Sequence, residues 1–287
     1  MTRRIEQIVA EALGARPTAV DRLGGGCVAE VWRARLPDGR RVVVKRDEAS
    51  PGSLDAEAFM LDYLAERTGL PAPAVIAHTP GALVMEFVEG TPGASGEAEA
   101  DAARLLADLH DITADAYGFE RETAIGGLPQ PNHWCGSWLE FFAEWRLRHM
   151  ARLAHEAGRL PARARGAIDA IAGSLDRWLV EPPAPSLIHG DVWAGNVLST
   201  GGRVTAFLDP ALAYADAEHE LAFITLFSTF GERFFDAYSA RRPIRDGFFE
   251  TRRRVYNLYP LLVHARLFGG SYSARVADEA RRLLGRG

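Results

Sequence analysis

Strand-like and helix-like patterns occupy different parts of this chain, and their order constrains the fold more than any other feature. Between Val20 and Arg46 apolar residues recur with a period near two, and Pro37-Asp38-Gly39 supplies a hairpin turn. Further strands are predicted at 74–78 and 82–87. Helical spacing is found at 3–13, 52–67, 97–111, 137–157, 161–179, 217–229, 231–240, 246–268 and 272–284. Strands that come first and helices that follow favour an α+β fold over alternating βαβ units.

The composition excludes several classes of protein. The 287 residues are 47% hydrophobic, and the net charge of −5 argues against non-specific nucleic-acid binding, which needs a basic surface. No stretch approaches the roughly 20 apolar residues of a membrane span, and Glu6, Gln7 and Glu11 interrupt any signal-peptide pattern. Cys27 and Cys135 lie far apart, so a disulfide framework is not indicated. We therefore expect a cytoplasmic protein with neither a membrane nor a nucleic-acid partner.

The most linker-like composition lies between the last predicted strand and the first long helix of the second part. The segment Glu89-Gly90-Thr91-Pro92-Gly93-Ala94-Ser95-Gly96 is rich in glycine, proline and small residues, which favour turns over regular structure. We therefore predict two parts, residues 1–90 and residues 91–287, joined at this segment.

One segment of the second part, 187–210, interrupts the helical pattern and carries the most informative polar residues. Asp191 precedes Asn196 by five positions, and Asp209 follows after a short apolar strand. The kinase catalytic loop His-Arg-Asp-x-x-x-x-Asn and the later metal-binding aspartate have the same layout. Gly190 stands where protein kinases have arginine, and this difference indicates a kinase that acts on small molecules.

These polar residues suit the separate tasks of phosphoryl transfer. We predict that Asp191 is the catalytic base, because a loose transition state mainly needs an oriented hydroxyl and neutralised charge. Asn196 and Asp209 are predicted to bind Mg²⁺ through the oxygen ligands that this ion prefers. The alternative makes Asp191 and Asp209 ordinary turn residues beside Gly190 and Pro210, but their joint spacing disfavours it.

A second group of residues, in the first part, fits a nucleotide site. Gly24, Gly25 and Gly26 lie between two predicted strands, where glycine lets the backbone approach phosphate, although triple glycine also forms ordinary turns. Lys45 ends an apolar strand, and an inward-pointing ammonium needs an anionic partner, which nucleotide phosphate and Glu57 on the next helix can supply. A surface lysine that reaches solvent is the alternative.

The end of the last predicted strand is the candidate adenine site. In a kinase this position is the hinge, and backbone groups near Glu86 and Val88 are predicted to hydrogen-bond the base. An ordinary strand is the alternative, because the contacts involve the main chain and the side chains cannot distinguish the two.

Together these residues resemble the fructosamine (ketosamine) kinase family, within the larger group of aminoglycoside and choline kinases. The run from His189 to Asn196 is similar to the family's His-Gly-Asp-Leu-Trp-Ser-Gly-Asn. Other matching segments are Gly24-Gly25-Gly26-Cys27, Gly118-Phe119, Ile125-Gly126, Pro129-Gln130-Pro131-Asn132, Trp138 with Phe141-Phe142, Asp209-Pro210-Ala211, and Leu261 to His264 through Leu267 to Tyr272. The resemblance covers essentially the whole chain.

The resemblance implies a two-lobed protein-kinase-like fold, with a five-stranded antiparallel sheet in the N-lobe and a mainly helical C-lobe. It also implies ATP-dependent phosphorylation of the 3-hydroxyl of a ketosamine, with Mg²⁺ as cofactor. The unstable 3-phosphate then releases the amine, which makes the family deglycation and repair enzymes. Two alternatives stay open: an aminoglycoside or amino-alcohol phosphotransferase, and an inactive kinase fold that serves as a binding module.

Two residues are candidates for substrate contact. The ring of Trp193 is expected to pack on the sugar, although packing under the loop is the alternative. His264 is expected to line the substrate cleft, with an ordinary core histidine as the alternative.

Cys27 would lie in the phosphate loop, where a thiol of lowered pKa is open to oxidation. The preferred ketosamine and the oligomeric state do not follow from the sequence.

The chain departs from the family pattern at two places. After Phe119 the family tends to have Asp-Asn, where this chain has Glu122-Thr123. The family's helix aspartate is Glu220 here, and we expect it to accept backbone N–H groups of the catalytic loop. His189 is expected to brace the same loop. Neither departure falls on the predicted base or metal ligands.

Overall fold

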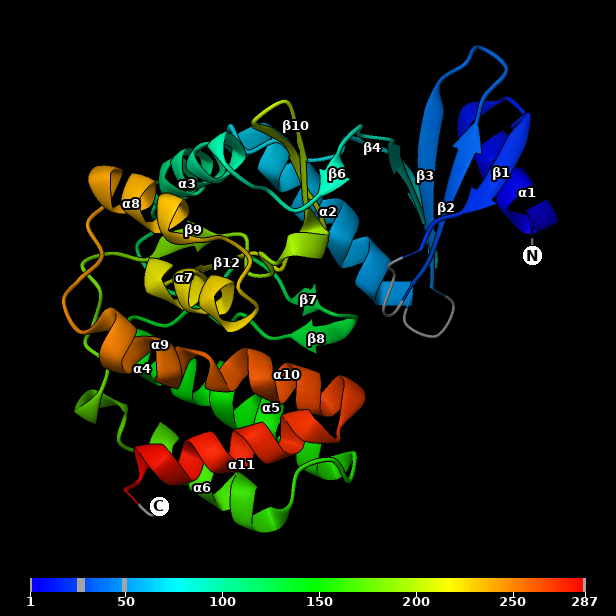
Figure 1. Ribbon diagram of the computed structural model, residues 1–287. Coiled ribbons are helices and arrows are strands. Elements are labelled where there is room, and N and C mark those ends of the chain that lie inside the picture. The colour runs from blue at the N-terminus through cyan, green and yellow to red at the C-terminus, as the bar shows by residue number, and fades with distance from the viewer. Residues whose placement is uncertain (1, 25–28, 48–50, 286–287) are drawn as a thin grey trace.

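The computed structural model describes residues 2–24, 29–47 and 51–285, which form a β-rich N-lobe and a larger helical C-lobe (Figure 1). The N-lobe holds a five-stranded antiparallel sheet of order β1-β2-β3-β5-β4. Its strands are β1 (Ala19–Arg22), β2 (Glu30–Arg35), β3 (Arg41–Arg46), β4 (Val75–Thr79) and β5 (Ala82–Glu86). The expected α+β class and the five-stranded antiparallel sheet are therefore confirmed.

Different helices cover the two faces of this sheet, because side chains alternate along each strand. Helix α1 (Thr2–Leu13) buries Ile5 and Val9 against Val44 of β3 on one face. Helix α2 (Pro51–Arg67) packs its apolar side against the other face. The step of one residue from Val44 to Lys45 directs Lys45 toward α2, which carries Glu57.

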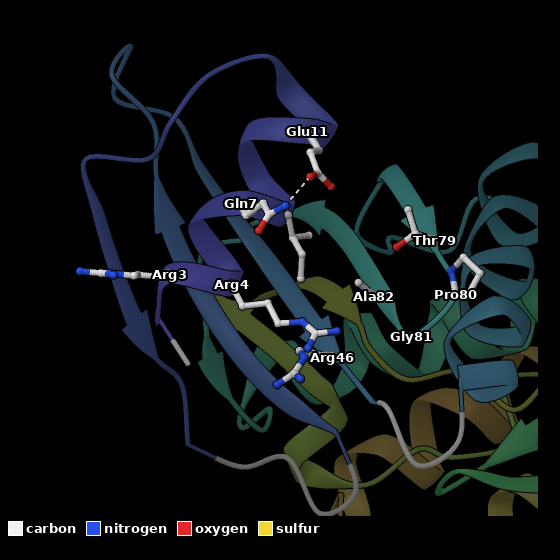
Figure 2. A pocket seen from close by; sticks show the side chains of 10 residues that line it. Arg3, Arg4, Gln7, Glu11, Arg46, Thr79, Pro80, Gly81 and Ala82 are labelled. Carbon is white, nitrogen blue, oxygen red and sulfur yellow. Dashed lines mark hydrogen bonds between the residues drawn. The ribbon is translucent and has the colours of Figure 1, made fainter.

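Arg46, the residue after Lys45, points to the α1 face and lines a cavity of about 540 Å³ between α1 and the β4–β5 turn. Figure 2 shows the side chains of Arg4 and Arg46 near one another in this cavity, and Gln7 bonded to Glu11 on α1. The sheet therefore separates this cavity from the face that carries Lys45.

The C-lobe consists mainly of helices, with short strands between them (Figure 1). Its helical segments are α3 (Glu97–His110), α4 (Trp138–Phe141), η1 (Phe142–Arg148), α5 (His149–Glu156), α6 (Ala162–Ala172), η2 (Leu175–Arg177), η3 (Ala194–Asn196), α7 (Ala217–Leu226), α8 (Glu232–Arg241), η4 (Phe248–Arg252), α9 (Arg253–Tyr256), α10 (Leu258–Phe268) and α11 (Ser271–Leu283). Its strands are β6 (Thr91–Pro92), β7 (Thr123–Ile125), β8 (Leu128–Gln130), β9 (Ser186–Ile188), β10 (Val197–Thr200), β11 (Arg203–Phe207) and β12 (Ala213–Ala215). The segments η1 and η4 are π-helical.

The sequence pattern did not reveal two features of the C-lobe. The helix predicted at 137–157 contains the π-helical turns of η1, to which a 3.6-residue period is insensitive. The antiparallel hairpin of β7 and β8 has strands of only three residues, too short to display a period of two. Gly126 and Gly127 form its turn with φ of 54° and 75°, values that glycine adopts without strain.

The chain leaves the N-lobe sheet after β5 and passes close to β10. A Cβ atom on Gly90 would lie 2.9 Å from the Cβ of Leu198, so this approach requires glycine. Directly afterwards β6 pairs with β10, with Thr91 opposite Ser199. The boundary between residues 90 and 91 stays a prediction. Among the described residues, no helix has the length and apolar character needed to cross a membrane.

Candidate active site

The stretches around Asp191 and Asp209 lie side by side. Strand β9, which precedes Asp191, pairs with β12, which follows Asp209, and the Ala211 N–H donates to the His189 carbonyl at 2.7 Å. Gly190 permits this approach, because its φ is 87° and a Cβ there would lie 2.2 Å from the Ala211 oxygen. A larger residue at 190, such as the arginine of protein kinases, would therefore push the two stretches apart.

A short 3₁₀ turn, η3, brings Asn196 back onto Asp191. The Asn196 side-chain amide donates to the Asp191 carboxylate at 2.8 Å and to the Asp191 backbone oxygen at 3.0 Å. Because both bonds use the amide nitrogen, the Asn196 Oδ1 faces away from Asp191. Burial and, second, the charge of Asp209 raise the pKa of Asp191 to about 8.

Lys45 connects the N-lobe to the catalytic segment. Its Nζ lies 2.5 Å from Glu57 Oε1 and also pairs with Asp209, 164 positions further along the chain. Only 9% of the Lys45 side chain is exposed, compared with 48% for Asp209. Burial disfavours the ammonium, but the charges of Asp209 and Glu57 outweigh it and raise the pKa of Lys45. Lys45 therefore points inward rather than to solvent.

A buried chain of hydrogen-bonded polar groups supports the loop that carries Asp191. Glu220 accepts the N–H of Gly190 at 2.5 Å and that of His189 at 3.3 Å, as the sequence predicts. The His110 ring bonds Glu220 at 2.8 Å and Tyr238 at 2.7 Å. Burial lowers the pKa of His189, whose Nδ1 accepts the Asp191 N–H at 3.3 Å. A neutral His189 thus braces the loop, as predicted.

The predicted phosphate loop is described only at its first residue. Gly25, Gly26 and Cys27 lie outside the described residues. At Gly24, no described heavy atom lies within 4 Å of the position that a Cβ would occupy. The predicted roles of these residues therefore stay predictions.

The predicted adenine site falls at the end of β5. Glu86 is exposed, and its N–H donates to the Ala74 carbonyl at 2.9 Å. The Glu86 N–H is thus used within the N-lobe, and a backbone contact of this segment with adenine stays a prediction. Val88 follows in an irregular segment and is half-buried.

The two predicted substrate residues lie in different surroundings. The ring of Trp193 covers Gly195 so closely that a Cβ there would lie 2.3 Å from a ring atom, and Trp193 is half-buried. His264 on α10 lies among the rings of Phe227 and Tyr272, at 4.9 Å from each, and its Nδ1 bonds the Pro260 carbonyl at 2.8 Å. Trp193 thus belongs to the catalytic loop, whereas His264 belongs to an aromatic cluster on the helices.

Sequence reasoning missed a set of buried polar side chains beside the catalytic segment. Thr123 and Gln130 of the β7–β8 hairpin hydrogen-bond the backbone carbonyls of Leu212 and Ala211. The available signals were the family-like segment 129–132 and the departure from the family pattern at Glu122-Thr123, to which no structural role was attached.

Comparison with known proteins identifies relatives over the whole chain. The family model described as fructosamine kinase matches residues 1–286. The "Probable ketoamine kinase YniA" of Escherichia coli K12 is 34% identical over 297 residues, covering 99% of each chain. The chloroplastic protein-ribulosamine 3-kinase of Arabidopsis thaliana is 30% identical, covering 97% of this chain and 87% of that protein.

Solved structures agree with this assignment. A Thermobifida fusca protein with the provisional name fructosamine-3-kinase has a TM-score of 0.86 at 33% identity, covering 98% of each chain. The aminoglycoside phosphotransferase APH(4)-Ia has a TM-score of 0.67 at 17% identity, covering 99% of this chain and 98% of that one. The second likeness shows a shared kinase-like fold alone. Because the family model and a relative of 34% identity both match almost the whole length of the chain, the chain belongs to the fructosamine kinase family.

Proposed function

We propose that this protein is an ATP-dependent kinase that phosphorylates the 3-hydroxyl of ketosamines. The observation that carries the proposal is the contact of Asp191 with Asn196 beside the Lys45–Asp209 pair, in a chain of this family. Relatives named as a ketoamine kinase and a protein-ribulosamine 3-kinase support this class of acceptor. Breakdown of the 3-phosphate product would release the amine, so the cellular role is deglycation, in the cytoplasm.

Asp191 acts as the base in the proposed reaction. Its carboxylate accepts the proton of the 3-hydroxyl while that oxygen bonds the γ-phosphorus and the β–γ bridging bond breaks, which releases ADP. Asn196 holds the carboxylate in place through its two amide hydrogen bonds. General-base assistance of this kind typically contributes ~10²–10⁴-fold in rate.

Asn196 and Asp209 are the proposed Mg²⁺ ligands. Both offer oxygen atoms, and the Asn196 Oδ1 is directed away from Asp191. Three carboxyl groups, those of Asp191, Asp209 and Glu57, share the single cation Lys45, and the charge of Asp209 that helps to raise the pKa of Asp191 is one that a divalent cation would offset. When bound, Mg²⁺ supplies neutralisation of the phosphate charge.

The N-lobe, residues 1–90, is the proposed nucleotide-binding part, and 91–287 the catalytic part. Lys45, fixed by Glu57, contacts the phosphates, and the backbone of Gly24, Gly25 and Gly26 covers them. The Glu86 carbonyl and the Val88 N–H bind adenine. For the substrate, the exposed part of the Trp193 ring packs on the sugar, and His264 lines the substrate cleft.

A screen of acceptors tests this proposal. ATP consumption would be measured with ribulosamines, fructosamines and aminoglycosides, and phosphorus NMR would locate the transferred phosphate. We expect turnover with the ketosamines and phosphate on the 3-oxygen. Phosphorylation confined to aminoglycosides would replace the acceptor class, and absence of turnover with every acceptor would overturn the assignment as an enzyme.

A further inference from the structure

Three buried polar side chains of the β7–β8 hairpin and the residues after it form one hydrogen-bonded unit. Thr123 Oγ1 accepts the amide N–H groups of Gln130 at 2.9 Å and of Asn132 at 2.7 Å. Gln130, Asn132 and Thr123 are each 3% exposed. Buried amides of this kind are costly unless their hydrogen bonds are formed, so the three residues constrain one another.

Two residues on the C-lobe helices anchor this unit. Arg146, 2% exposed and within the π-helical η1, donates to Asn132 Oδ1 at 2.6 Å and to the Pro131 carbonyl at 2.7 Å. Tyr259 of α10 donates to Gln130 Oε1 at 2.7 Å. Because arginine can only donate, the orientation of the Asn132 amide is fixed. The π-helical turn thus places a guanidinium on the unit.

The free donors of this unit point to the backbone after Asp209. Thr123 Oγ1 donates to the Leu212 carbonyl at 3.3 Å, and Gln130 Nε2 to the Ala211 carbonyl at 3.2 Å. On its other side the same backbone is bound by His189, through the Ala211 N–H at 2.7 Å. Segment 209–212 is therefore held between the catalytic loop and the hairpin.

Thr123, Gln130 and Asn132 thus form a clamp on segment 209–212, and this segment contains an unusual backbone conformation. Asp209 has a φ of 54°, in the left-handed region that residues with a Cβ seldom adopt. Such a conformation persists only where the surrounding structure determines it. Asp209 also pairs with Lys45 across the two lobes, so its position depends on both the clamp and the N-lobe.

We propose that Thr123, Gln130 and Asn132 are positioning residues, which hold segment 209–212 so that the Asp209 carboxylate faces the metal–nucleotide complex. The inference rests on the proposed function, in which Asp209 is a metal ligand. Anchoring by Arg146 and Tyr259 makes the clamp part of the C-lobe core. Supporting groups of metal ligands typically contribute about 10- to 100-fold in metal affinity, and these act through the backbone, so the lower value is expected.

The test measures Mn²⁺ binding to the protein with a non-hydrolysable ATP analogue, by the electron paramagnetic resonance signal of free Mn²⁺. Thr123→Val removes the hydroxyl at nearly constant volume and is expected to weaken Mn²⁺ binding about 10-fold. Thr123→Ser should restore it. Thr225→Val is the matched control, because its hydroxyl also donates to a backbone carbonyl, that of Ala222 at 2.7 Å, away from the clamp.

Further measurements separate this inference from its premise. Analogue binding in chelator should change less than 2-fold in Thr123→Val, since the metal-free nucleotide does not need Asp209. Mn²⁺ affinity within 2-fold of wild type would overturn the inference. Tyr259→Phe, which retains the ring, should weaken Mn²⁺ binding in the same direction and serves if Thr123→Val does not fold. Asp209→Asn tests the premise: if it leaves Mn²⁺ affinity unchanged, the metal role of Asp209 fails instead.

Discussion

Two clusters of charged side chains in this protein contain similar groups but differ in the balance between acidic and basic groups. The catalytic cluster consists of Lys45, Glu57, Asp191 and Asp209. The structural cluster consists of Asp216, Glu218, Arg245, Arg252 and Tyr256. The catalytic cluster has three carboxylates and one cation, whereas the structural cluster has two carboxylates and two guanidinium groups.

The hydrogen bonds and pKa shifts of the two clusters agree with this difference in charge balance. In the structural cluster Arg252 holds Glu218 with two bonds, at 2.5 and 3.0 Å, and Arg245 adds a third at 2.9 Å. Burial alone would raise the pKa of Glu218, but these bonds outweigh it and lower the pKa. In the catalytic cluster burial raises the pKa of Asp191, and Asp209 keeps a left-handed backbone. Balanced charge thus suits a framework, whereas the imbalance supports the proposal that nucleotide and metal bind at the catalytic cluster.

The largest effect is expected from a substitution that disables the catalytic cluster and leaves the fold intact. Asp191→Asn should lower turnover by at least ~100-fold, because it removes the proposed general base. The melting temperature should not fall, because burial already disfavours the charged carboxylate. Steady-state kinetics and thermal melting check both parts, with the exposed Asp176→Asn as control. Unchanged turnover would remove Asp191 from the mechanism.

The residues of the catalytic cluster were accessible from the sequence, whereas the structural cluster was not predicted. The spacing of Asp191, Asn196 and Asp209 is local, so one loop and two strands determine it. Within the N-lobe sheet, β2 and most of β3 alternate between buried and less buried residues, and β5 is a short buried apolar run, so these strands were predictable. The pairing of Lys45 with Asp209 was not predicted, because the two residues lie 164 positions apart and no local pattern relates them.

Other parts could not be predicted from local patterns. Thr123 and Gln130 hydrogen-bond segment 209–212, and Arg146 reaches the same unit through Asn132; no spacing rule relates these residues. Single polar residues in short strands or π-helical turns carry no periodic signal. The departure from the family pattern at Glu122-Thr123 falls on this clamp, where a side chain is selected by its hydrogen bonds.

The next largest effect is expected from a substitution in the structural cluster. Arg252→Ala leaves a buried Glu218 with only Arg245, and removing one partner of a buried pair typically costs 3–5 kcal/mol. Because Arg245 remains, we expect about 3 kcal/mol of lost stability, measured by chemical unfolding. The neighbouring Arg253→Ala, half-buried against Phe249, is the control and should cost under ~1 kcal/mol. A loss in Arg252→Ala no larger than in the control would contradict the framework role.

A smaller effect concerns pH. The folded pKa of Glu218 lies below its unfolded value of about 4.3, so its contribution is present above that pH and is lost as the pH falls through the folded pKa. Glu218→Gln should cost about 2 kcal/mol near pH 7, and its difference from wild type should shrink below about pH 4. Unfolding curves across this range check it, with the exposed Glu232→Gln as control. A difference independent of pH would contradict the lowered pKa.

The smallest effect is also the most direct comparison, because two buried tyrosine hydroxyls lie three positions apart. Tyr256 donates to Asp216 at 2.7 Å in the structural cluster, whereas Tyr259 donates to Gln130 at 2.7 Å in the clamp. Tyr256→Phe should cost about 1 kcal/mol of stability while leaving Mn²⁺ affinity at the wild-type value. Tyr259→Phe should weaken Mn²⁺ binding. If both variants weakened Mn²⁺ binding equally, burial of a hydroxyl, rather than its connection to segment 209–212, would govern the metal site.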